Sequence, residues 1–360
     1  MWSFHNPVKV IFGAGTAVSA AAGRLAGRRW ALVTYELPAF KDIARAIAER
    51  AGAPAVTVDN IVANPDVADL ASCCAALKGA GVETILALGG GSIIDAAKVM
   101  AASGGNFDPV LAHLQHKTPL DPRAVLPLIA VPSTAGTGSE VTCWATVWDA
   151  GAGKKYSLAH PSLYPEFAIV DPELTLGAPR TLTVATGLDA LSHALESIWN
   201  VGANPISTDF AVSAAADILD ALPKLARDLG NGELRSRLSA AALRAGLAFS
   251  NTRTALAHNI SYDVTLLRGT PHGIACSFSL PAVMEWSLGC DPACDAALTR
   301  IFGPDLRAGA ARLRAFLEEL GVATVPEAYG FDDAQWRELV RKAAGGERGR
   351  NFIGRNRLAA

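Results

Sequence analysis

Apolar residues in the first half of the chain gather into short runs, and amphipathic stretches of helical length lie between several of them. Two of these stretches are Phe40–Ala51 and Val67–Ala80. Strands that alternate with helix-length segments predict crossover connections and a largely parallel sheet with helices on both faces. The runs expected to form strands are Val8–Phe12, Trp30–Thr34, Ala55–Val58, Thr84–Leu88, Leu126–Val131 and Phe167–Val170.

The pattern changes after Asp171-Pro172. From about Thr181 onward, alanine and leucine recur with helical spacing and convincing strands disappear. Gly177 and Pro179 interrupt the chain between the two patterns. We therefore expect an α/β domain at residues 1–178 and an all-helical domain at residues 179–360. Segments expected to be helical in the second domain are Ser207–Leu229, Gly232–Ser250 and Asp305–Leu320.

Composition narrows the class of protein. The 360 residues are 50% hydrophobic and 18% charged, which suits two globular domains. The formal net charge of −2 gives no electrostatic reason to bind nucleic acid or a membrane surface. No apolar segment reaches the length of a membrane span, the first residues lack the pattern of a signal peptide, and the six cysteines are scattered. These features predict a cytoplasmic protein with reduced cysteines.

A glycine-rich segment directly follows the expected strand Thr84–Leu88 and opens a helix. Glycines let backbone N–H groups approach an anion, and the N-terminus of a helix favours negative charge. The segment therefore suits the pyrophosphate of a dinucleotide, although such a turn can also serve packing alone. A second loop of small and hydroxyl residues, Pro132–Glu140, follows another strand and would line the same groove. The glycine-rich segment consists of Gly89, Gly90, Gly91 and Ser92.

The helical half contains a set of residues that can ligate a metal. Asp189 and His193 are four positions apart, so on a helix they share one face. With His258 and His272 they offer one oxygen and three nitrogen ligands, a set that suits Fe²⁺ or Zn²⁺. Each of these residues could alone be structural. Their place in one helical domain that follows a dinucleotide-type domain favours the metal interpretation.

A series of motifs extends over nearly the whole chain. They are Asn6-Pro7, Phe12–Gly15, Asn64-Pro65, Gly89–Lys98, Pro132–Glu140, Asp171–Thr175, Gly187–Glu196 and Pro271–Gly273. In this order and at these distances they resemble the iron-containing (group III) alcohol dehydrogenase family. The resemblance implies an N-terminal dinucleotide-binding domain, a C-terminal all-helical domain, a catalytic metal and a homodimer.

Carried over position by position, the resemblance implies roles for individual residues. The metal would be Fe²⁺, with Zn²⁺ as the alternative, and the cofactor NAD(H) or NADP(H). The implied metal ligands are Asp189, His193, His258 and His272. The residues implied to hold the pyrophosphate or line the cofactor groove are Gly89, Gly90, Gly91, Ser92, Asp95, Lys98, Thr134, Thr137 and Gly138.

Two positions depart from the family's pattern. Many members carry a second histidine four residues after the third ligand, which is thought to relay a proton, whereas this chain has Tyr262. The tyrosine hydroxyl, the cofactor ribose or a water at the metal could each supply the proton. Many members also end their second strand with an aspartate that binds the adenosine ribose. This chain has Tyr35 followed by Glu36 there, so the choice between NAD and NADP stays open.

Further details resemble the branch of the family described as phosphonoacetaldehyde reductases, which form 2-hydroxyethylphosphonate. They are the short chain, Trp2, the run His258–Tyr262 and the segment Glu347–Phe352. A phosphonate needs several cationic donors. Those in the C-terminal tail could equally form a solvated basic surface. The arginines that we expect to meet the anion are Arg253, Arg268, Arg348 and Arg350.

The sequence therefore predicts the metal-dependent reduction of a small aldehyde, expected to be phosphonoacetaldehyde, to a primary alcohol by a nicotinamide cofactor. The alternatives are a general short-chain alcohol dehydrogenase or a glycerol dehydrogenase-like enzyme, a non-redox enzyme like dehydroquinate synthase, and a binding protein without turnover. Only small molecules and a second copy of the chain are expected as partners. The residues expected to take part in catalysis are Asp189, His193, His258, His272 and Tyr262.

Overall fold

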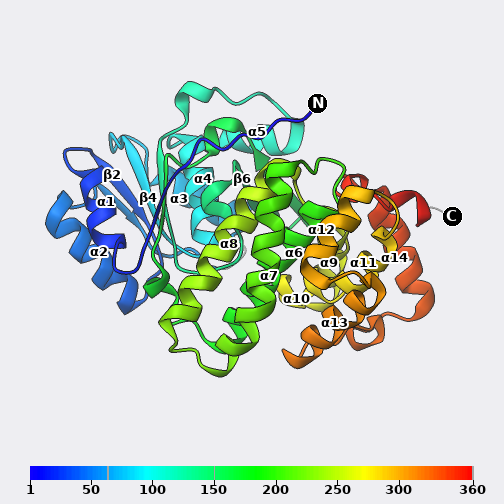
Figure 1. The fold of residues 1–360 in the computed structure, drawn as a ribbon. Helices are drawn as coiled ribbons and strands as arrows, with labels where there is room; N and C mark the ends of the chain where they lie inside the picture. The colour runs from blue at the N-terminus through cyan, green and yellow to red at the C-terminus, as the bar shows by residue number, and fades with distance from the viewer. Residues whose placement is uncertain (63–64, 150, 359–360) are drawn as a thin grey trace. The chain divides into compact units, whose positions relative to one another are not determined.

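The computed structural model describes residues 1–62, 65–149 and 151–358, so Asn64 of the motif Asn64-Pro65 lies outside the described residues. The chain forms two compact units, both drawn in Figure 1. The α/β unit comprises Pro7–Thr134 and Ser139–Thr175, and the helical unit comprises Met1–Asn6, Ala135–Gly138 and Leu176–Ala360. The helical unit thus includes two short segments from the first half of the chain. A domain boundary between residues 178 and 179 stays a prediction.

A six-stranded parallel sheet forms the centre of the α/β unit, with the strand order β1-β8-β5-β4-β2-β3. All six strands expected from the hydrophobic runs are present, with ends shifted by two residues at most. The parallel α/β fold class is therefore confirmed. The strands are β1 (Lys9–Phe12), β2 (Trp30–Val33), β3 (Val56–Val58), β4 (Thr84–Gly89), β5 (Leu128–Pro132) and β8 (Phe167–Val170).

Helices cover both faces of this sheet, as buried parallel strands require. The helices are α1 (Ala17–Leu25), α2 (Pro38–Ala51), α3 (Val67–Ala75), α4 (Gly91–Ser103) and α5 (Asp108–His116). Short 3₁₀ turns occur at η1 (Pro122–Ala124), η2 (Ser139–Val141), η3 (Pro161–Leu163) and η4 (Pro172–Thr175).

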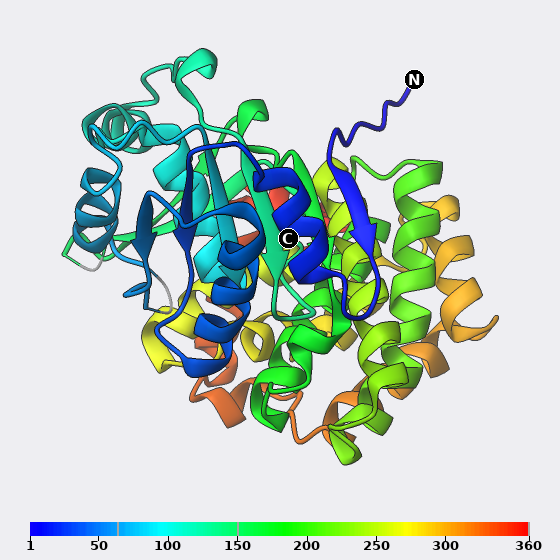
Figure 2. The same cartoon turned by 90° about the vertical axis from the view of Figure 1, so that its left-hand side faces the viewer.

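Side chains alternate between two cores along the central strand β4. Leu86 and Leu88 pack in one core with residues of α1 and α2, the blue helices on the side of the sheet turned toward the viewer in Figure 2. Ile85 and Ala87 point the other way and pack with residues of α3, α4 and α5. This period of two explains why the strand is apolar at almost every position.

An antiparallel hairpin, β6 (Trp144–Asp149) and β7 (Lys154–Ala159), was not expected from the sequence. Val147 and Leu158 are fully buried in the core beneath α3 and α4, but the positions beside them in the two strands are half-exposed or exposed. The short alternating pattern and the two lysines at the start of β7 hide this hairpin from a search for apolar runs.

The second unit is all-helical, which confirms the predicted class of its fold. Alanine and leucine fill its core, and the alanines allow the helix backbones to approach closely. Its helices are α6 (Arg180–Ile198), α7 (Pro205–Arg227), α8 (Gly232–Thr252), α9 (Leu256–Arg268), α10 (His272–Ser277), α11 (Leu280–Ser287), α12 (Pro292–Phe302), α13 (Leu306–Glu319) and α14 (Asp333–Gly345). Its 3₁₀ turns are η5 (Pro326–Tyr329), η6 (Gly349–Asn351) and η7 (Arg355–Arg357).

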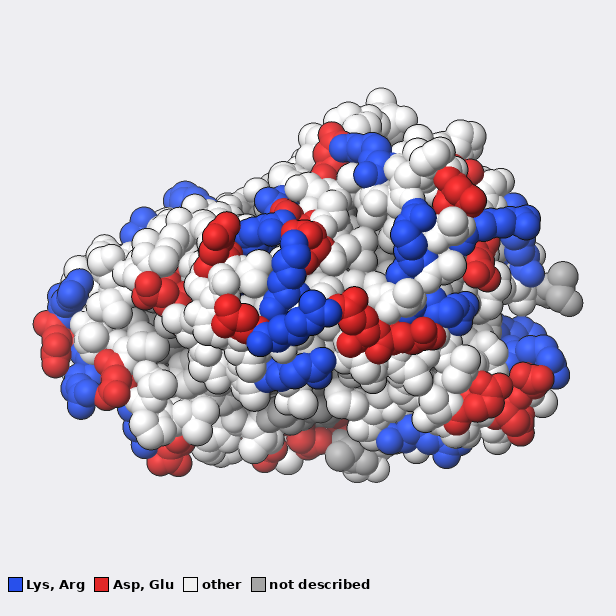
Figure 3. Space-filling view, turned by 60° about the horizontal axis from the view of Figure 1, so that its bottom comes forward, with Lys and Arg blue, Asp and Glu red and all other residues white. Residues whose placement is uncertain are grey.

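Surface charges agree with the near-neutral composition. On the face drawn in Figure 3, Lys and Arg are interspersed with Asp and Glu. The described part of that face therefore offers no extended basic surface of the kind that binds a polyanion. None of the helices in the described ranges combines the length and the apolar character that crossing a membrane requires.

Candidate metal centre and nucleotide loop

Helix α6 carries the first two candidate ligands on one buried face. Asp189 and His193 are one turn apart, and the Asp189 Oδ1 atom lies 3.7 Å from His193 Nε2. Only 4% of Asp189 and 5% of His193 is exposed. A carboxylate is buried this deeply only when cations or strong hydrogen-bond donors compensate it. The expected convergence of the two side chains from their spacing is therefore realised in the fold.

Glu196, two turns after Asp189 on the same helix, holds His258 of α9 in place. Its carboxylate accepts a hydrogen bond from His258 Nδ1 at 2.6 Å and from the backbone N–H groups of Ala255 and His258. Glu196 is fully buried. Because Nδ1 donates to this carboxylate, a neutral His258 carries its free lone pair on Nε2. A carboxylate behind an imidazole is the usual support for a metal-binding histidine.

The lone pair of His258 Nε2 points toward another acceptor. This atom lies 3.4 Å from Asp189 Oδ1, and among the described residues neither atom has a hydrogen-bond partner. Two buried acceptors at this distance repel each other unless a cation or a proton lies between them. The pair is therefore suited to a bound cation.

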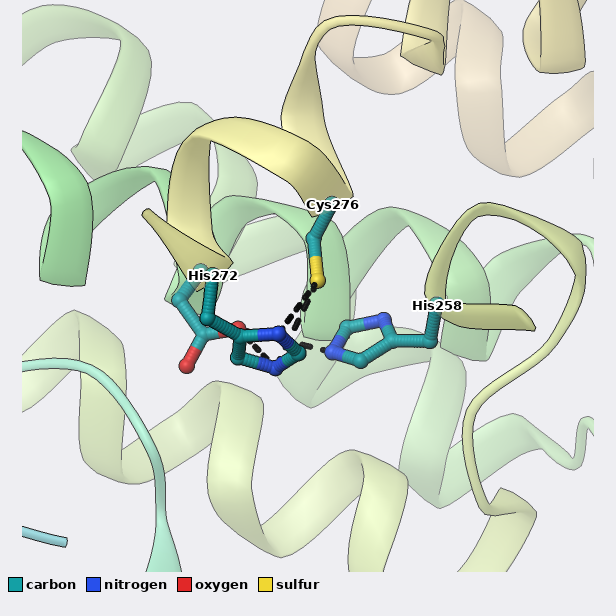
Figure 4. Close-up of side chains that lie close together, drawn as sticks. His258, His272 and Cys276 are labelled. Carbon is teal, nitrogen blue, oxygen red and sulfur yellow. Dashed lines mark hydrogen bonds and ion pairs between the residues drawn. The ribbon is translucent and has the colours of Figure 1, made fainter. Parts of the chain in front are cut away.

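Helix α10 adds His272 and Cys276, which are one turn apart. His272 Nε2 lies 3.9 Å from Asp189 Oδ1, and the Sγ atom of Cys276 lies 3.5 Å from the same His272 nitrogen. Figure 4 shows His258, His272 and Cys276 pointing toward one another. The helix can lie this close because Gly273 has no side chain, since a Cβ atom there would be 1.9 Å from the carbonyl oxygen of Ala185 in α6.

Four side chains offer ligand atoms that all lie within 4.8 Å of one another: Asp189, His258, His272 and Cys276. His193 is not in this group, although its ring stacks on His258 with the ring centroids 4.7 Å apart and on Phe249 with the centroids 4.0 Å apart. Asp189, His258 and His272 thus lie together with Cys276 near them, and His193 Nε2 is 3.7 Å from Asp189 Oδ1, closer than His272 Nε2. The assignment of the four expected ligands stays a prediction.

Electrostatics favour a carboxylate at Asp189 and a neutral imidazole at His193. Burial would raise the pKa of Asp189, but His193, His258 and His272 outweigh it and hold the pKa far below its usual range. Burial lowers the pKa of His193 to about 4, so this imidazole is neutral. For His258, burial acts downward, but Cys276, Glu196 and Asp189 outweigh it and raise the pKa.

The donor set fits a divalent metal ion. Ligand atoms about 2.0–2.3 Å from a tetrahedral ion lie roughly 3.3–3.6 Å from one another. The distance of 3.4 Å between His258 Nε2 and Asp189 Oδ1 agrees with such a cage. Asp189 Oδ1 lies slightly farther from the other two histidines, 3.7 Å from His193 Nε2 and 3.9 Å from His272 Nε2. The unpartnered acceptors and the carboxylate behind His258 provide the charge and the orientation that an ion requires.

Tyr262 lies one turn after His258 on α9 and interacts electrostatically with Arg348, His258, Cys276 and Glu196. Burial raises the pKa of its hydroxyl. The Arg348 guanidinium lies over the tyrosine ring, 5.4 Å from its centroid, and donates a hydrogen bond to the Thr254 hydroxyl. Tyr262 and Arg348 therefore belong to the surroundings of the candidate ligands.

The other three arginines expected near the substrate have different surroundings. Arg268 donates to the carbonyl oxygen of Gly330, and Arg350 donates to that of Gly345. Arg253 is an exposed residue with a φ angle of 64° at the end of α8, where the chain reverses toward α9. Their role toward an anion stays a prediction, whereas Arg348 contacts Tyr262 beside the candidate ligands.

The glycine-rich segment forms the junction between β4 and α4. Gly89 must be glycine because a Cβ atom would lie 2.5 Å from Cγ1 of Ile93, and a Cβ atom on Gly90 would lie 3.3 Å from the Tyr35 hydroxyl. Gly90 caps a 13-residue helix, whose first N–H groups can meet an anion. Gly91 and Ser92 form the first turn of that helix. The junction has the geometry that a pyrophosphate needs, and its assignment as a cofactor site stays a prediction.

Asp95 and Lys98 in α4 are occupied by protein partners. Asp95 accepts hydrogen bonds from the Ser139 hydroxyl and the Thr146 N–H group. The Lys98 ammonium donates to the carbonyl oxygens of Ser139 and Trp144 and to the hydroxyls of Ser139 and Thr142. Burial lowers the pKa of Lys98 to about 8. These contacts attach the end of the second loop and the segment after it to α4, so both residues position this part of the chain.

The second loop contributes to both units. Thr134 lies in the α/β unit, and its side chain is close to Gly90, since a Cβ atom on Gly90 would be 3.4 Å from Cγ2 of Thr134. Thr137 and Gly138 belong to the helical unit. Gly138 has a φ angle of 61°, and a Cβ atom there would lie 2.7 Å from the Cα atom of Gly246 in α8. Close packing on α8 thus explains this glycine.

Sequence reasoning missed Glu196 and Cys276, which the fold places beside the candidate ligands. Glu196 lies seven positions after Asp189, a spacing of two helical turns that places both residues on one face. Cys276 follows His272 by four positions, the same spacing as Asp189 and His193. Both spacings were readable, but an isolated glutamate or cysteine at helical spacing is common and points to no particular chemistry.

Comparisons with known proteins agree over both halves of the chain. A family model described as iron-containing alcohol dehydrogenase matches residues 7–172, and one described as the C-terminal part of the Fe-containing alcohol dehydrogenase family matches residues 183–353. In a solved structure, sulfoacetaldehyde reductase from Bifidobacterium kashiwanohense in complex with NAD⁺ is similar at a TM-score of 0.91 and 28% identity. The match covers 100% of this chain and 98% of that one.

Two curated relatives extend the comparison. The probable alcohol dehydrogenase EutG of Escherichia coli is 39% identical over 63% of this chain and 57% of its own length. The phosphonoacetaldehyde reductase of Streptomyces viridochromogenes is 33% identical over 73% of this chain and 64% of its own length. The chain thus matches less than two thirds of the length of either curated relative.

Proposed function

Because this chain belongs to the iron-containing alcohol dehydrogenase family, we propose that it reduces a small aldehyde to a primary alcohol with a nicotinamide cofactor and a divalent metal ion. The observation that carries the proposal is the pair of unpartnered buried acceptors, His258 Nε2 and Asp189 Oδ1, which are 3.4 Å apart beside His272. Fe²⁺ is the proposed ion and Zn²⁺ the alternative, since both accept nitrogen and oxygen ligands.

A bound divalent ion would supply Lewis acidity toward the aldehyde oxygen, and a bound nicotinamide would supply the hydride. The residues of the chain keep the site ready for this chemistry. Glu196 holds the Nδ1 proton of His258, which leaves the Nε2 lone pair directed into the site. In the proposed reaction the Tyr262 hydroxyl gives its proton to the product oxygen and regains one from solvent. The aldehyde thereby gains one hydride and one proton.

We further propose that the aldehyde carries an acidic head group, with phosphonoacetaldehyde as the first substrate to test. Arg348 supports this because its guanidinium lies on the Tyr262 ring, beside the candidate ligands. Phosphonate and sulfonate are both tetrahedral oxyanions that a guanidinium binds well. Two of the relatives are named as reductases of aldehydes with such groups.

We propose NAD(H) as the cofactor. The sulfoacetaldehyde reductase structure contains NAD⁺. In this chain Glu36 follows Tyr35 at the end of β2 and pairs with Lys41, their charged atoms 3.0 Å apart. A carboxylate at this point disfavours the 2′-phosphate of NADP.

The test is a steady-state assay of protein loaded with Fe²⁺ or, separately, with Zn²⁺. Oxidation of NADH and NADPH is followed with phosphonoacetaldehyde, sulfoacetaldehyde and propionaldehyde. We expect kcat/KM to be at least roughly tenfold higher for an acidic aldehyde than for propionaldehyde, as one charge-assisted hydrogen bond allows. No oxidation with any aldehyde would reject the proposed activity.

The second candidate is a dehydrogenase of uncharged short-chain alcohols. Its support is the similarity to EutG, a probable alcohol dehydrogenase, at a higher identity than that to the phosphonoacetaldehyde reductase. Equal or better kcat/KM with propionaldehyde in the same assay would favour this candidate and reject the acidic head group.

A further inference from the structure

We propose that Asn351 is a positioning residue for substrate recognition, because it helps to hold the Arg348 guanidinium in one place through Thr254, the residue before the N-cap of α9. The inference rests on the proposed acidic substrate and on the role given to Arg348 in binding its head group. It adds a residue that touches no substrate itself and acts only through its neighbours.

Thr254 accepts hydrogen bonds from both residues. Its hydroxyl accepts one from Nη1 of Arg348 at 2.5 Å, and its carbonyl oxygen accepts one from Nδ2 of Asn351 at 2.8 Å. Only 2% of Thr254 is exposed, so water has little access to replace these donors. The backbone N–H group of Asn351 also donates to the carbonyl oxygen of Arg348 at 2.9 Å. The three residues therefore form a closed ring of hydrogen bonds.

This ring is connected to the candidate metal ligands. Ala255, the residue after Thr254, donates its N–H group to the Glu196 carboxylate at 3.0 Å, and the same carboxylate holds the ring of His258. Thr254 is thus one residue away from the support of a candidate ligand. A guanidinium fixed on Thr254 consequently has a defined place relative to the end of the site where the aldehyde is proposed to react.

The backbone around Asn351 is anchored independently of its side chain. The carbonyl oxygen of Asn351 accepts a hydrogen bond from the Val201 N–H group at 2.8 Å, and the next residue, Phe352, is fully buried. On the other side, a Cβ atom on Gly349 would lie 1.9 Å from the carbonyl oxygen of Ala343. Removing the Asn351 side chain should therefore loosen Thr254 and Arg348 while the segment itself stays in place.

Fixing Arg348 before the substrate arrives favours binding. A free arginine side chain loses considerable conformational entropy when it is held by a ligand, and this loss opposes binding unless it has already been incurred in the fold. A guanidinium has five N–H donors, and one group donates to Thr254 while a flat face lies on the Tyr262 ring. A guanidinium held in this way can present its other donors to a tetrahedral oxyanion.

The experiment compares wild type, Asn351→Leu, Asn351→Ala, Arg348→Ala and the double variant Arg348→Ala/Asn351→Leu, each as the metal-loaded full chain. Leucine has nearly the size of asparagine but donates no hydrogen bond. KM and kcat are measured with phosphonoacetaldehyde, sulfoacetaldehyde and propionaldehyde. Calorimetry gives the Kd of 2-hydroxyethylphosphonate and 2-hydroxyethanesulfonate without turnover. The matched control is Asn231→Ala, which removes the N-cap of α8 in the same unit.

We expect each Asn351 variant to raise KM for the acidic aldehyde, and Kd for the corresponding alcohol, by roughly 3- to 10-fold, the range of one neutral hydrogen bond. The KM for propionaldehyde and all kcat values should stay within about twofold. In the Arg348→Ala background, Asn351→Leu should add less than about twofold, because its effect passes through Arg348. Asn231→Ala should lower the Tm but leave every KM within about twofold.

The outcomes separate this inference from the proposed function. If Arg348→Ala weakens binding of the acidic compounds but the Asn351 variants do not, Asn351 has no positioning role while the head-group site stands. Equal losses for charged and uncharged aldehydes, or a full Asn351 effect in the Arg348→Ala background, would also overturn the inference. If wild type shows no preference for acidic aldehydes, the proposed substrate class itself fails. The Tm of each variant shows whether it is folded, and the alanine variant provides the comparison if leucine is not accommodated.

Discussion

At the scale of single residues, the candidate centre depends on where protons are held. Glu196 accepts three hydrogen bonds from the chain segment that carries His258, one of them from the ring itself. Burial would raise the pKa of this carboxyl, but His258 outweighs burial and lowers it. The residue therefore remains a carboxylate inside the protein and keeps His258 in the tautomer that can bind a cation.

Replacing Glu196 by glutamine is expected to weaken metal binding by roughly 10- to 100-fold, because the amide cannot orient the imidazole as a carboxylate does. Equilibrium dialysis against a competing chelator measures the change. Glu285→Gln, an exposed glutamate of α11, is the matched control and should leave the affinity unchanged. An E196Q variant that is folded and binds metal as tightly as wild type would contradict the role given to this carboxylate.

In the proposed function, the choice of substrate depends on Arg348. Its truncation to alanine is expected to raise KM for an acidic aldehyde by roughly 10- to 100-fold, the range of one charge-assisted hydrogen bond. The KM for propionaldehyde should stay within about twofold, since no anion is involved. Arg355, an exposed arginine that donates to the carbonyl oxygen of Arg350, provides the control R355A. Equal loss for charged and uncharged aldehydes would instead indicate a structural role through Tyr262.

At the scale of the elements, the short helix α10 matters more than its length suggests. It carries two side chains of the candidate centre, and it can approach α6 only through Gly273. Packing of one helix against another thus sets the distances between ligand atoms.

Gly273→Ala is expected to destabilise the protein by about 1–3 kcal/mol, because the added methyl group would overlap the carbonyl of Ala185 and force the helices apart. Metal affinity should fall in parallel. Denaturant titration measures the stability, with Gly345→Ala as the control, since nothing lies within 4 Å of a Cβ atom at that helical position. A G273A variant as stable as G345A would show that the two helices can separate without cost.

At the scale of the whole molecule, the candidate ligands and the glycine-rich junction belong to different compact units. The ligands lie on α6, α9 and α10 of the helical unit, whereas the junction of β4 and α4 lies in the α/β unit. A bound metal ion or a bound cofactor should therefore stabilise mainly the unit that binds it. A ligand present at about a thousandfold its Kd contributes roughly 4 kcal/mol by mass action.

Metal removal and cofactor addition are accordingly expected to leave different patterns of amide hydrogen exchange. Chelation should speed exchange in α6, α9 and α10 and lower the Tm, and added Zn²⁺ should reverse both effects. NADH should slow exchange at the first turn of α4. Identical patterns for metal and NADH would contradict the assignment of the two sites to the two units. The predicted homodimer is a separate question, for which light scattering of the metal-loaded protein is the measurement.

The order of apolar and polar residues was enough to predict the parallel sheet, all six of its strands and the all-helical second half. Local patterns carry this information because a buried strand and an amphipathic helix each impose their own period on the chain. The hairpin of β6 and β7 was not predictable in the same way, since its burial depends on α3 and α4 covering Val147 and Leu158. The local sequence of the hairpin could not indicate that two helices would cover these side chains.

For the site, residue types and spacing sufficed to propose Asp189, His193, His258 and His272 as one cluster. The distances between them arise only when α6, α9 and α10 pack together, which joins residues more than sixty positions apart, such as Asp189 and His258. The same packing brings Glu196 behind His258 and Cys276 beside His272. Spacing along the chain constrains neighbours on one helix, whereas a ligand cage is built from separate helices, and only their packing brings the donor atoms together.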